Sequence, residues 1–579
     1  MLQQHYRWKN RQLRDHVAVI DGEKPPNILL KNARFLHSTM RRWVEANIWI
    51  ANDRIVYVGE KLPQKLDGCE VVNCENFTLV PGYIEPHVHP FQLYNPQSFA
   101  EYASQSGTTS FVSDNLVLFL FLKNKKAFSL MNELNKLPFS LFWWCRYDPM
   151  TELNQEDEKF SHRDVKSWIE SGFVIQGGEL TGWPKLLDGD DMILHWIQET
   201  KRLGKRIEGH FPGASEKTLT KMTLLGADGD HESMTGKDVY KRLMQGYTVA
   251  LRHSSIRPDL EILLREIREM GLDQYDQMTF TTDGSFPSFY EDGVIDRMIA
   301  KALEFGVPTM DAYQMASYNV AKHYRIDHYY GMIAPGRVAN INFLENENNP
   351  TPVSVLSKGQ WVKKNGTKVY HGHPIKWENW GLKPISFHWD LKKEDLQFSM
   401  PFGIQMVNDV ITKPYSLTRD ISLDQLPEDD ESFLLLLDRN GQWRVSTVLK
   451  GFDNRVQGLA SSFSSTGDIV LIGKRKEEMR RAFQRMKEIG GGIVLAENGK
   501  VIHEISLKLS GMMSDQSMEE LIKEEKRMKK LLIDRGYSFS DPFYTLLFLS
   551  ATHLPYIRVT SRGIYDVMKK TILFPTIMR

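Results

Sequence analysis

Short β-type runs alternate with helical patterns between residues 80 and 330, and this alternation restricts the fold more than any other feature of the sequence. The runs are rich in β-branched and aromatic residues, and amphipathic stretches such as MILHWIQETKRLG and DLEILLREIREMG separate most of them. Eight strands are expected, in the runs TLVPGYIE, TTSFVSD, FSLFWWCRYD, FVIQGGE, KRIEGH, GADGDH, YTVALR and QMTFTTD. Eight strands that alternate with helices over about 250 residues are typical of a (β/α)8 barrel, so the fold class is α/β.

Two further β-type blocks, at 27–79 and 333–372, lie on either side of the predicted barrel at 80–332. The second block contains an Asn-Gly hairpin signal at Asn365 and Gly366. We expect both flanks to form one small composite β-sandwich domain. Residues 385–579 combine β runs such as SFLLLLDRN with charged helices such as SMEELIKEEKRMKKLLIDRG, which predicts a separate C-terminal α+β domain. Residues 1–26 form an N-terminal extension.

Charge, cysteine content and hydropathy argue against nucleic acid and membrane as partners and favour a cytoplasmic protein. Lys plus Arg and Asp plus Glu both total 73, so nothing favours nucleic acid as a partner. The three cysteines include no C-x-x-C pair, which favours reduced thiols and a cytoplasmic protein. The apolar run FVSDNLVLFLFL is short and contains Asp114, whereas a membrane span needs about 20 apolar residues, so no membrane partner is expected.

Potential metal ligands follow the predicted strands at their carboxyl ends. Chemistry in a (β/α)8 barrel gathers at these ends, which all open onto one mouth. The first strand ends in a His-x-His pair, and later strands end in the segments QGGEL, EGHFPG, DGDHES and TTDGSFP. The residues expected to converge there are His87, His89, Glu179, His210, His231 and Asp283.

Four imidazoles and two carboxylates form a donor set suited to Zn²⁺, Mn²⁺ or Fe²⁺. Six such ligands exceed what one tetrahedral ion needs, and a carboxylate can bridge two ions. Two cations would also offset the repulsion between acidic groups crowded at one mouth. The sequence therefore predicts a site for two divalent metal ions.

Several segments together resemble the amidohydrolase superfamily and, more narrowly, the bacterial adenine deaminase family. The barrel segments are VPGYIEPHVHP, GGEL, EGHFPG, DHES and TTDG, followed by MASYNVAKHYRIDHYYGMIAPGRVANINFLE. The segments EIGGGIVLAENGKVIHEISLKLSGMMSD and DPFYTLLFLSATHLPYIRVTSRGIYDV resemble the C-terminal domain of the same family. The resemblance covers nearly the whole chain from about residue 28.

The resemblance implies a role for each matching residue. His87, His89, His210 and His231 match metal ligands, Glu179 matches the carboxylate that bridges the two ions, and Asp283 matches the aspartate of the eighth strand. Asp283 is expected to move the proton from the water to the leaving amine, and Glu179 to relay a proton. Arg252, Ser254 and Asp114 are expected to contact the substrate. Mn²⁺ or Fe²⁺ is the expected metal, with Zn²⁺ as the alternative.

The sequence also departs from the family pattern. PFQLY follows the His-x-His pair where Ile-Glu-Ser-Ser is usual, and SDNLVL replaces Asp-Pro-His-Glu. Gly284 follows Asp283 where a second aspartate is usual, and SSTGD replaces a His-Asp-Ser-His-Asn segment. Adenine deamination in purine salvage is therefore weighed against hydrolysis of another heterocycle or cyclic amide. A catalytically silent metal-binding protein is the third hypothesis.

The expected partner is a small purine or a related heterocycle. The C-terminal domain is expected either to cap the barrel mouth or to form a subunit interface, the latter in a homodimer.

Overall fold

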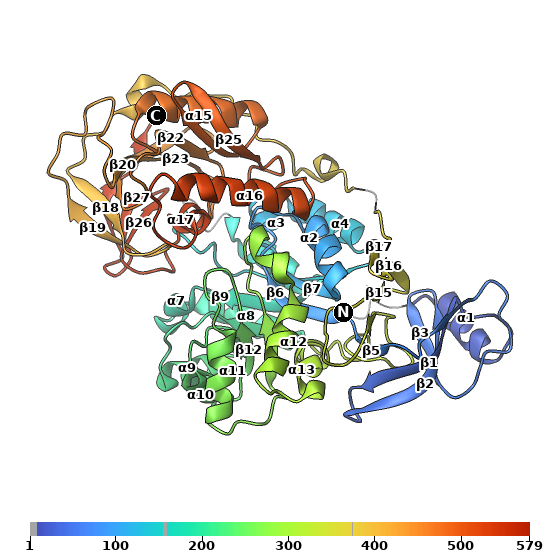
Figure 1. Cartoon of the computed structure of the whole chain (residues 1–579). Coiled ribbons are helices and arrows are strands. Elements are labelled where there is room, and N and C mark those ends of the chain that lie inside the picture. The colour runs from blue at the N-terminus through green and yellow to red at the C-terminus, as the bar shows by residue number, and fades with distance from the viewer. Residues whose placement is uncertain (1–7, 154–158, 373) are drawn as a thin grey trace.

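A parallel eight-stranded barrel forms the centre of the computed structural model, which describes residues 8–153, 159–372 and 374–579 (Figure 1). Its strands pair in chain order, and the last strand lies beside the first, so the barrel is nearly closed. The strands are β6 (Tyr83–Val88), β7 (Thr108–Asp114), β8 (Ser140–Cys145), β9 (Val174–Leu180), β10 (Arg206–Gly209), β11 (Gly229–Asp230), β12 (Thr248–Arg252) and β13 (Met278–Thr281). The predicted barrel fold is confirmed.

Helices surround the barrel because the strands bury both of their faces. Every residue of β8, with the sequence SLFWWC, is buried, as expected for a strand between a barrel interior and a helix layer. α11 buries Leu260, Leu263, Leu264 and Ile267, which recur at helical spacing. The helical segments are α2 (Pro96–Ala103), η2 (Ser104–Ser106), α3 (Leu116–Phe121), α4 (Asn124–Leu134), α6 (His162–Glu170), α7 (Trp183–Leu187), α8 (Asp191–Arg202), α9 (Glu216–Leu224), α10 (Gly236–Met244), α11 (Leu260–Glu269), η3 (Pro287–Asp292), α12 (Ile295–Glu304), α13 (Thr309–Met315) and α14 (Tyr318–His323).

The seam between β6 and β13 is closed by a buried side chain. Glu85 of β6 accepts hydrogen bonds from the Thr281 hydroxyl at 2.8 Å and from the Thr282 hydroxyl at 2.7 Å. It also accepts one from the Thr282 backbone N–H at 3.1 Å. Burial raises the pKa of Glu85 to about 7, although these donors favour its charged form. Glu85 thus ties the strand that carries His87 to the strand that leads to Asp283.

A second sheet combines strands from both sides of the barrel region. β5 pairs in parallel with β1 and antiparallel with β14, and so joins the two sequence blocks. The predicted first barrel strand, TLVPGYIE, is in fact divided: β5 belongs to this sheet and β6 to the barrel, with Gly82 between them. The elements are α1 (Asn10–Ile20), β1 (Ile28–His37), β2 (Arg42–Ala51), β3 (Arg54–Gly59), β4 (Glu70–Asn73), β5 (Thr78–Pro81), β14 (Ile341–Leu344), β15 (Ser354–Ser357), β16 (Gln360–Lys364) and β17 (Thr367–Lys368).

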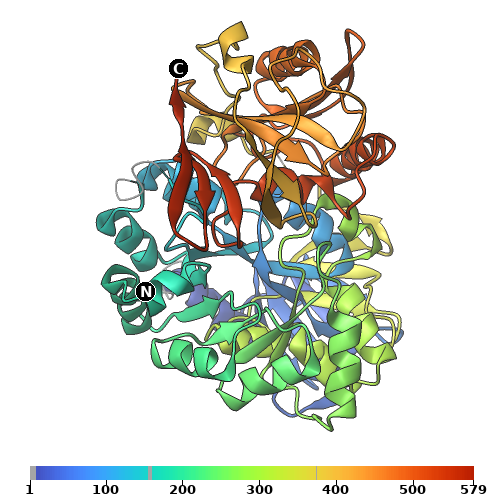
Figure 2. The same ribbon diagram turned by 90° about the vertical axis from the view of Figure 1, so that its left-hand side faces the viewer.

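The rest of the chain forms a C-terminal α+β domain that lies against the barrel (Figure 2). It contains a mixed sheet, which includes the strands β18 to β25, and a three-stranded sheet. The elements are η4 (Trp377–Trp380), η5 (Lys393–Leu396), β18 (Phe402–Met406), β19 (Thr412–Ser416), β20 (Glu431–Leu437), β21 (Trp443–Lys450), β22 (Gly458–Ser461), β23 (Ile469–Gly473), α15 (Lys476–Ile489), β24 (Gly492–Glu497), β25 (Lys500–Ser506), α16 (Met518–Ile533), α17 (Pro542–Phe548), β26 (Ile557–Thr560), β27 (Gly563–Asp566), β28 (Thr571–Pro575) and β29 (Ile577–Met578).

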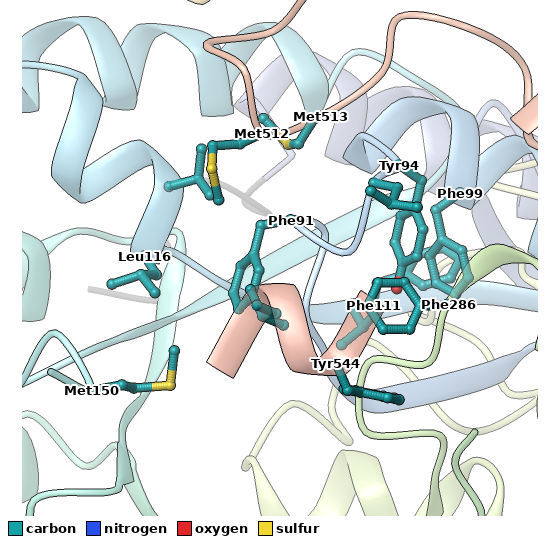
Figure 3. Packing of buried hydrophobic residues seen from close by; sticks show 14 of the residues in the cluster. Phe91, Tyr94, Phe99, Phe111, Leu116, Met150, Phe286, Met512, Met513 and Tyr544 are labelled. Carbon is teal, nitrogen blue, oxygen red and sulfur yellow. The ribbon is translucent and has the colours of Figure 1, made fainter. Parts of the chain in front are cut away.

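The barrel and the C-terminal domain share one apolar core. Figure 3 shows Met512, Met513 and Tyr544 of the C-terminal domain among barrel residues that include Phe91 and Phe286, and all five are buried. Polar contacts reinforce this interface: the Asn95 amide donates to the Ser514 carbonyl at 2.8 Å, and the Ser514 N–H donates to the Leu93 carbonyl at 2.6 Å. The C-terminal domain is therefore fixed over one end of the barrel.

Candidate active site

The six predicted metal ligands meet at the carboxyl ends of the barrel strands. His87 lies in β6 and Glu179 in β9, while His89, His210, His231 and Asp283 lie one or two residues after β6, β10, β11 and β13. Five of the six are buried and His210 is partly buried. His87 Nε2 lies 3.2 Å from His89 Nε2, and Asp283 Oδ1 lies 3.4 Å from the former and 3.2 Å from the latter. The structure thus brings together groups from strands that are far apart in the sequence.

Glu179 faces two separate histidine pairs with its two carboxylate oxygens. Its Oε1 lies 2.7 Å from His210 Nδ1 and 3.6 Å from His231 Nε2. Its Oε2 lies 3.9 Å from His87 Nε2 and 3.8 Å from His89 Nε2. A carboxylate whose two oxygens point at two donor groups has the arrangement needed to bridge two cations.

These donors form overlapping clusters that fit divalent cations. The ligand atoms of His87, Glu179, His231 and Asp283 lie within 4.8 Å of one another, and so do those of His210, His231 and Glu232. Burial and the neighbouring His231 lower the pKa of His87 well below its ordinary value, which favours the neutral imidazole that binds a metal. At His89, His210 and His231 burial acts in the same direction, but nearby carboxylates outweigh it and raise the pKa. Its ring stacks on Trp144 at 4.3 Å, which fixes its orientation. The chemistry and convergence of these groups therefore support a divalent metal site.

Arg146 is a buried cation that sequence reasoning missed. Its Nη2 donates to Asp114 Oδ2 at 2.6 Å and to Glu179 Oε2 at 2.7 Å. Burial raises the pKa of Glu179, but Arg146 and His210 outweigh that effect and hold it well below its ordinary value. Arg146 directly follows β8, so the same strand-end rule that selected the histidines could have selected it.

Glu232 is a second residue that sequence reasoning did not assign, although it directly follows His231. Its Oε1 lies 3.5 Å from both His210 Nδ1 and His231 Nε2. Arg252 and Arg257 form ion pairs with its two oxygens. Burial raises the pKa of Glu232, but His210 and the two arginines outweigh that effect and lower the pKa to about 2. Glu232 therefore offers a third carboxylate to the metal donor set.

The three predicted substrate contacts lie near the site but hold other side chains. Arg252 lines the cavity, and its Nη1 lies 2.6 Å from Asp283 Oδ2. Ser254 accepts a hydrogen bond from Arg252 Nε at 2.9 Å. Asp114 Oδ2 lies 2.8 Å from His89 Nδ1 and orients that imidazole, while Arg146 neutralises its charge. Of the three, only Arg252 lines the cavity as the described residues define it.

A cavity of about 400 Å³ opens above these groups, between the barrel mouth and the C-terminal domain. Its floor carries His89, Glu179, His210 and Asp283. Its walls are mainly apolar and come from both domains: Phe91, Met150, Ile256, Ile411, Phe548 and Leu554. A mostly apolar cavity with a few converging polar groups is typical of a site for a small organic molecule. The C-terminal domain thus caps the barrel mouth.

Comparison with known proteins agrees with this architecture. The profile of the amidohydrolase family matches residues 78–362, and that of the adenine deaminase C-terminal domain matches residues 409–571. A protein of Bacillus cereus named "Putative adenine deaminase" is 56% identical over 99% of this chain and 98% of its own length. One of Bacillus subtilis, named in the same way, is 54% identical over the full length of both chains. The chain belongs to the adenine deaminase family.

More distant relatives belong to the same family. A protein of Oceanobacillus iheyensis named "Adenine deaminase" is 25% identical over 96% of this chain and 97% of its own length. The same organism has a second protein, named "Putative adenine deaminase", that is 51% identical over 99% of both chains. Within residues 8–153, 159–372 and 374–579, each helix is too short or too polar to span a lipid bilayer.

Proposed function

We propose that this member of the adenine deaminase family is a metal-dependent hydrolase that converts adenine and water to hypoxanthine and ammonia, as a step of purine salvage. The observation that supports the proposal most directly is the position of Glu179, whose two oxygens face two histidine pairs on the floor of a mostly apolar cavity. Relatives 54% and 56% identical over nearly the full chain are named "Putative adenine deaminase".

The donor set suits two divalent ions, Mn²⁺ or Fe²⁺ by preference and Zn²⁺ as the alternative. His87, His89 and Asp283 would hold one ion, His210, His231 and Glu232 the other, and Glu179 would bridge them. When bound, such ions supply Lewis acidity, which makes water nucleophilic near neutral pH. Asp283 and Glu179 are then available for proton transfer.

In the proposed reaction a C–O bond forms at C6 of adenine and the bond from C6 to the exocyclic amine breaks. Asp283 accepts the proton that water loses and delivers it to the departing amine, so that ammonia leaves. Arg252 holds Asp283 Oδ2, and Asp283 Oδ1 thereby faces the reacting region. The apolar side chains of the cavity wall, which include Phe91 and Leu554, accept a flat ring and exclude bulk water.

The test combines a metal analysis with an ammonia assay. The wild-type protein, purified with Mn²⁺, is expected to hold two ions per chain and to release ammonia from adenine. In Asp283→Asn we expect kcat to fall by at least about 100-fold, the usual contribution of a positioned proton-transfer group. Metal content measured on the same sample separates a lost proton carrier from a lost ion. Unchanged ammonia release by Asp283→Asn contradicts the role given to this aspartate.

A second candidate is the hydrolysis of another heterocycle or cyclic amide. It is favoured by the presence in Oceanobacillus iheyensis of two proteins, one 51% and one 25% identical to this chain. It is also favoured by the segments PFQLY and SDNLVL, which depart from the family pattern beside the site. A panel of purines, pyrimidines and cyclic amides, read for ammonia and for ring opening, distinguishes the two candidates. The substrate in either case is a small molecule, and a homodimer is the assembly we propose.

A further inference from the structure

The C-terminal domain places a histidine in the cavity, beside the metal donor His210. His553 lies between α17 and β26 and lines the cavity together with Glu179, His210 and Asp283. Its ring meets that of His210 edge-on, with 5.7 Å between the ring centroids. On its other side it meets Phe548 edge-on at 5.8 Å. No other cavity-lining residue of the C-terminal domain carries an imidazole within the described chain.

The segment that carries His553 is held firmly against the barrel. The Thr552 N–H donates to the Met150 carbonyl at 2.9 Å, and the Thr151 hydroxyl donates to the Ser550 carbonyl. Met150 and Thr151 belong to the loop that follows β8, and Arg146 is the first residue of that loop. The position of the imidazole is therefore fixed relative to the barrel mouth.

A backbone contact indicates which ring nitrogen of His553 can accept a hydrogen bond. Nδ1 lies 3.4 Å from the Met150 carbonyl oxygen, which can only accept a hydrogen bond, so Nδ1 carries the proton. In a neutral imidazole the other nitrogen, Nε2, is then an acceptor. Within the part of the chain that the structure describes, Nε2 has no hydrogen-bond partner, and the ring lines the cavity.

We propose that His553 is the residue through which the C-terminal domain recognises the substrate, by accepting a hydrogen bond at Nε2 from an N–H group of the bound heterocycle. Adenine has such groups, a ring N–H and the exocyclic amine. Apart from His553 and the metal donors, the lining side chains with an acceptor atom are Gln92, Thr181 and Tyr544, and of these only Tyr544 also comes from the C-terminal domain. This proposal rests on the function proposed above. His553 would orient the ring, so that the carbon under attack faces the metal donors.

Two substitutions separate the acceptor from the shape of the side chain. His553→Phe keeps a flat ring but removes the acceptor, whereas His553→Gln can place an amide oxygen near the position of Nε2. We expect His553→Phe to raise KM for adenine about tenfold, the usual effect of one lost hydrogen bond, with kcat changed less than about threefold. His553→Gln is expected to stay close to the wild type. His195→Phe, at an exposed histidine of α8, is the matched control.

The readouts separate failure of this proposal from failure of the proposed function. If the wild type releases no ammonia from adenine, the proposed function fails, and equilibrium dialysis of radiolabelled adenine with the Mn²⁺-loaded variants then decides the role of His553. An about tenfold weaker binding in His553→Phe, with recovery in His553→Gln, supports the proposal by either route. An unchanged KM or dissociation constant in His553→Phe overturns it. Equal loss in both variants, loss of metal, or no adenine binding by the wild type also overturns it.

Discussion

A single guanidinium, that of Arg146, faces two carboxylates at the base of the site. It is fully buried, and its partners Asp114 and Glu179 are buried beside it. Removal of one partner from a buried ion pair is costly because the remaining charge has no compensation. We expect Arg146→Met to lower the free energy of unfolding by about 3–5 kcal/mol, measured by urea denaturation.

Arg163→Met is the control for this prediction, because the Arg163 side chain is 90% exposed and an exposed substitution usually changes stability by less than about 0.5 kcal/mol. Equal stability of Arg146→Met and Arg163→Met would show that the guanidinium does not compensate the two acids.

Asp296 gives a pH-dependent contribution to stability. It is buried at the start of α12, where it accepts hydrogen bonds from the Thr351 hydroxyl at 2.7 Å and from the Val294 N–H at 2.8 Å. Burial raises the pKa of Asp296 above its ordinary value in spite of these donors. The folded chain therefore binds this proton more tightly than the unfolded chain, and stability falls as pH rises from the unfolded pKa through the folded pKa.

An asparagine removes this titration and can keep both hydrogen bonds, with its amide donating to Thr351. The stability of Asp296→Asn relative to the wild type should therefore rise with pH above about 4, as urea denaturation at a series of pH values can measure. A difference between Asp296→Asn and the wild type that stays constant across the pH series would contradict the assignment.

At the scale of the elements, Gly82 is the point where the chain passes from one sheet to another. It lies between β5 and β6, and its N–H donates to the Asn340 carbonyl at 2.9 Å. A Cβ at this position would lie 2.3 Å from Thr109 Oγ1 and 3.0 Å from Asn340 Cβ. We expect Gly82→Val to destabilise the chain by about 1–3 kcal/mol, as overpacking does, with the midpoint of urea unfolding as the measurement.

A matched control is Gly68→Asn, since Gly68 has φ +74° and open space around its Cβ position. Asparagine tolerates that backbone conformation, so stability should change little. If both variants were equally stable, the close approach of the two sheets at Gly82 would not restrict the residue there.

The sequence predicts the barrel well because strand period and helix period differ sharply over this region. Where strands are short or change sheets, the prediction is coarser. β11 has only two residues, and side chains support it: Asp230 accepts from the Phe211 N–H at 2.8 Å and forms an ion pair with Arg242. The division between β5 and β6 has little local signal beyond Pro81 and Gly82, since every residue of both segments is buried.

The candidate site, like the fold, could be predicted only in part from the sequence. His87, Glu179 and Asp283 could be selected because the carboxyl ends of barrel strands share one mouth. Glu232 lies two residues after β11, as Asp283 lies two residues after β13, but only His231 was selected from that strand end. What distinguishes Glu232 from an ordinary loop carboxylate is its pair of ion pairs with Arg252 and Arg257. His553 is still less accessible to sequence reasoning, since it reaches the site from another domain.

At the scale of the whole molecule, one apolar core runs through the barrel and the C-terminal domain. The same cluster of buried residues includes Leu141 and Phe280 of the barrel strands and Leu521 and Leu546 of the C-terminal helices. The interface also contains polar contacts, such as Ser288, whose hydroxyl donates to Glu525 at 2.7 Å. We infer that the barrel and the C-terminal domain unfold together, since exposing either one exposes part of the core of the other.

Removal of metal should therefore weaken both domains, although the donors lie at the barrel mouth. A ligand that binds only the folded chain stabilises it by about 4 kcal/mol at a thousandfold excess over its dissociation constant. We expect the thermal midpoint in Mn²⁺ to exceed that in EDTA by several degrees, with β20 and α15 of the C-terminal domain losing hydrogen-exchange protection together with β8 of the barrel. Glu179→Gln, which cannot bridge two ions as a carboxylate, should show a smaller difference between Mn²⁺ and EDTA. A wild-type midpoint that does not respond to Mn²⁺ would contradict the metal site, and loss of protection confined to the barrel would contradict the shared core.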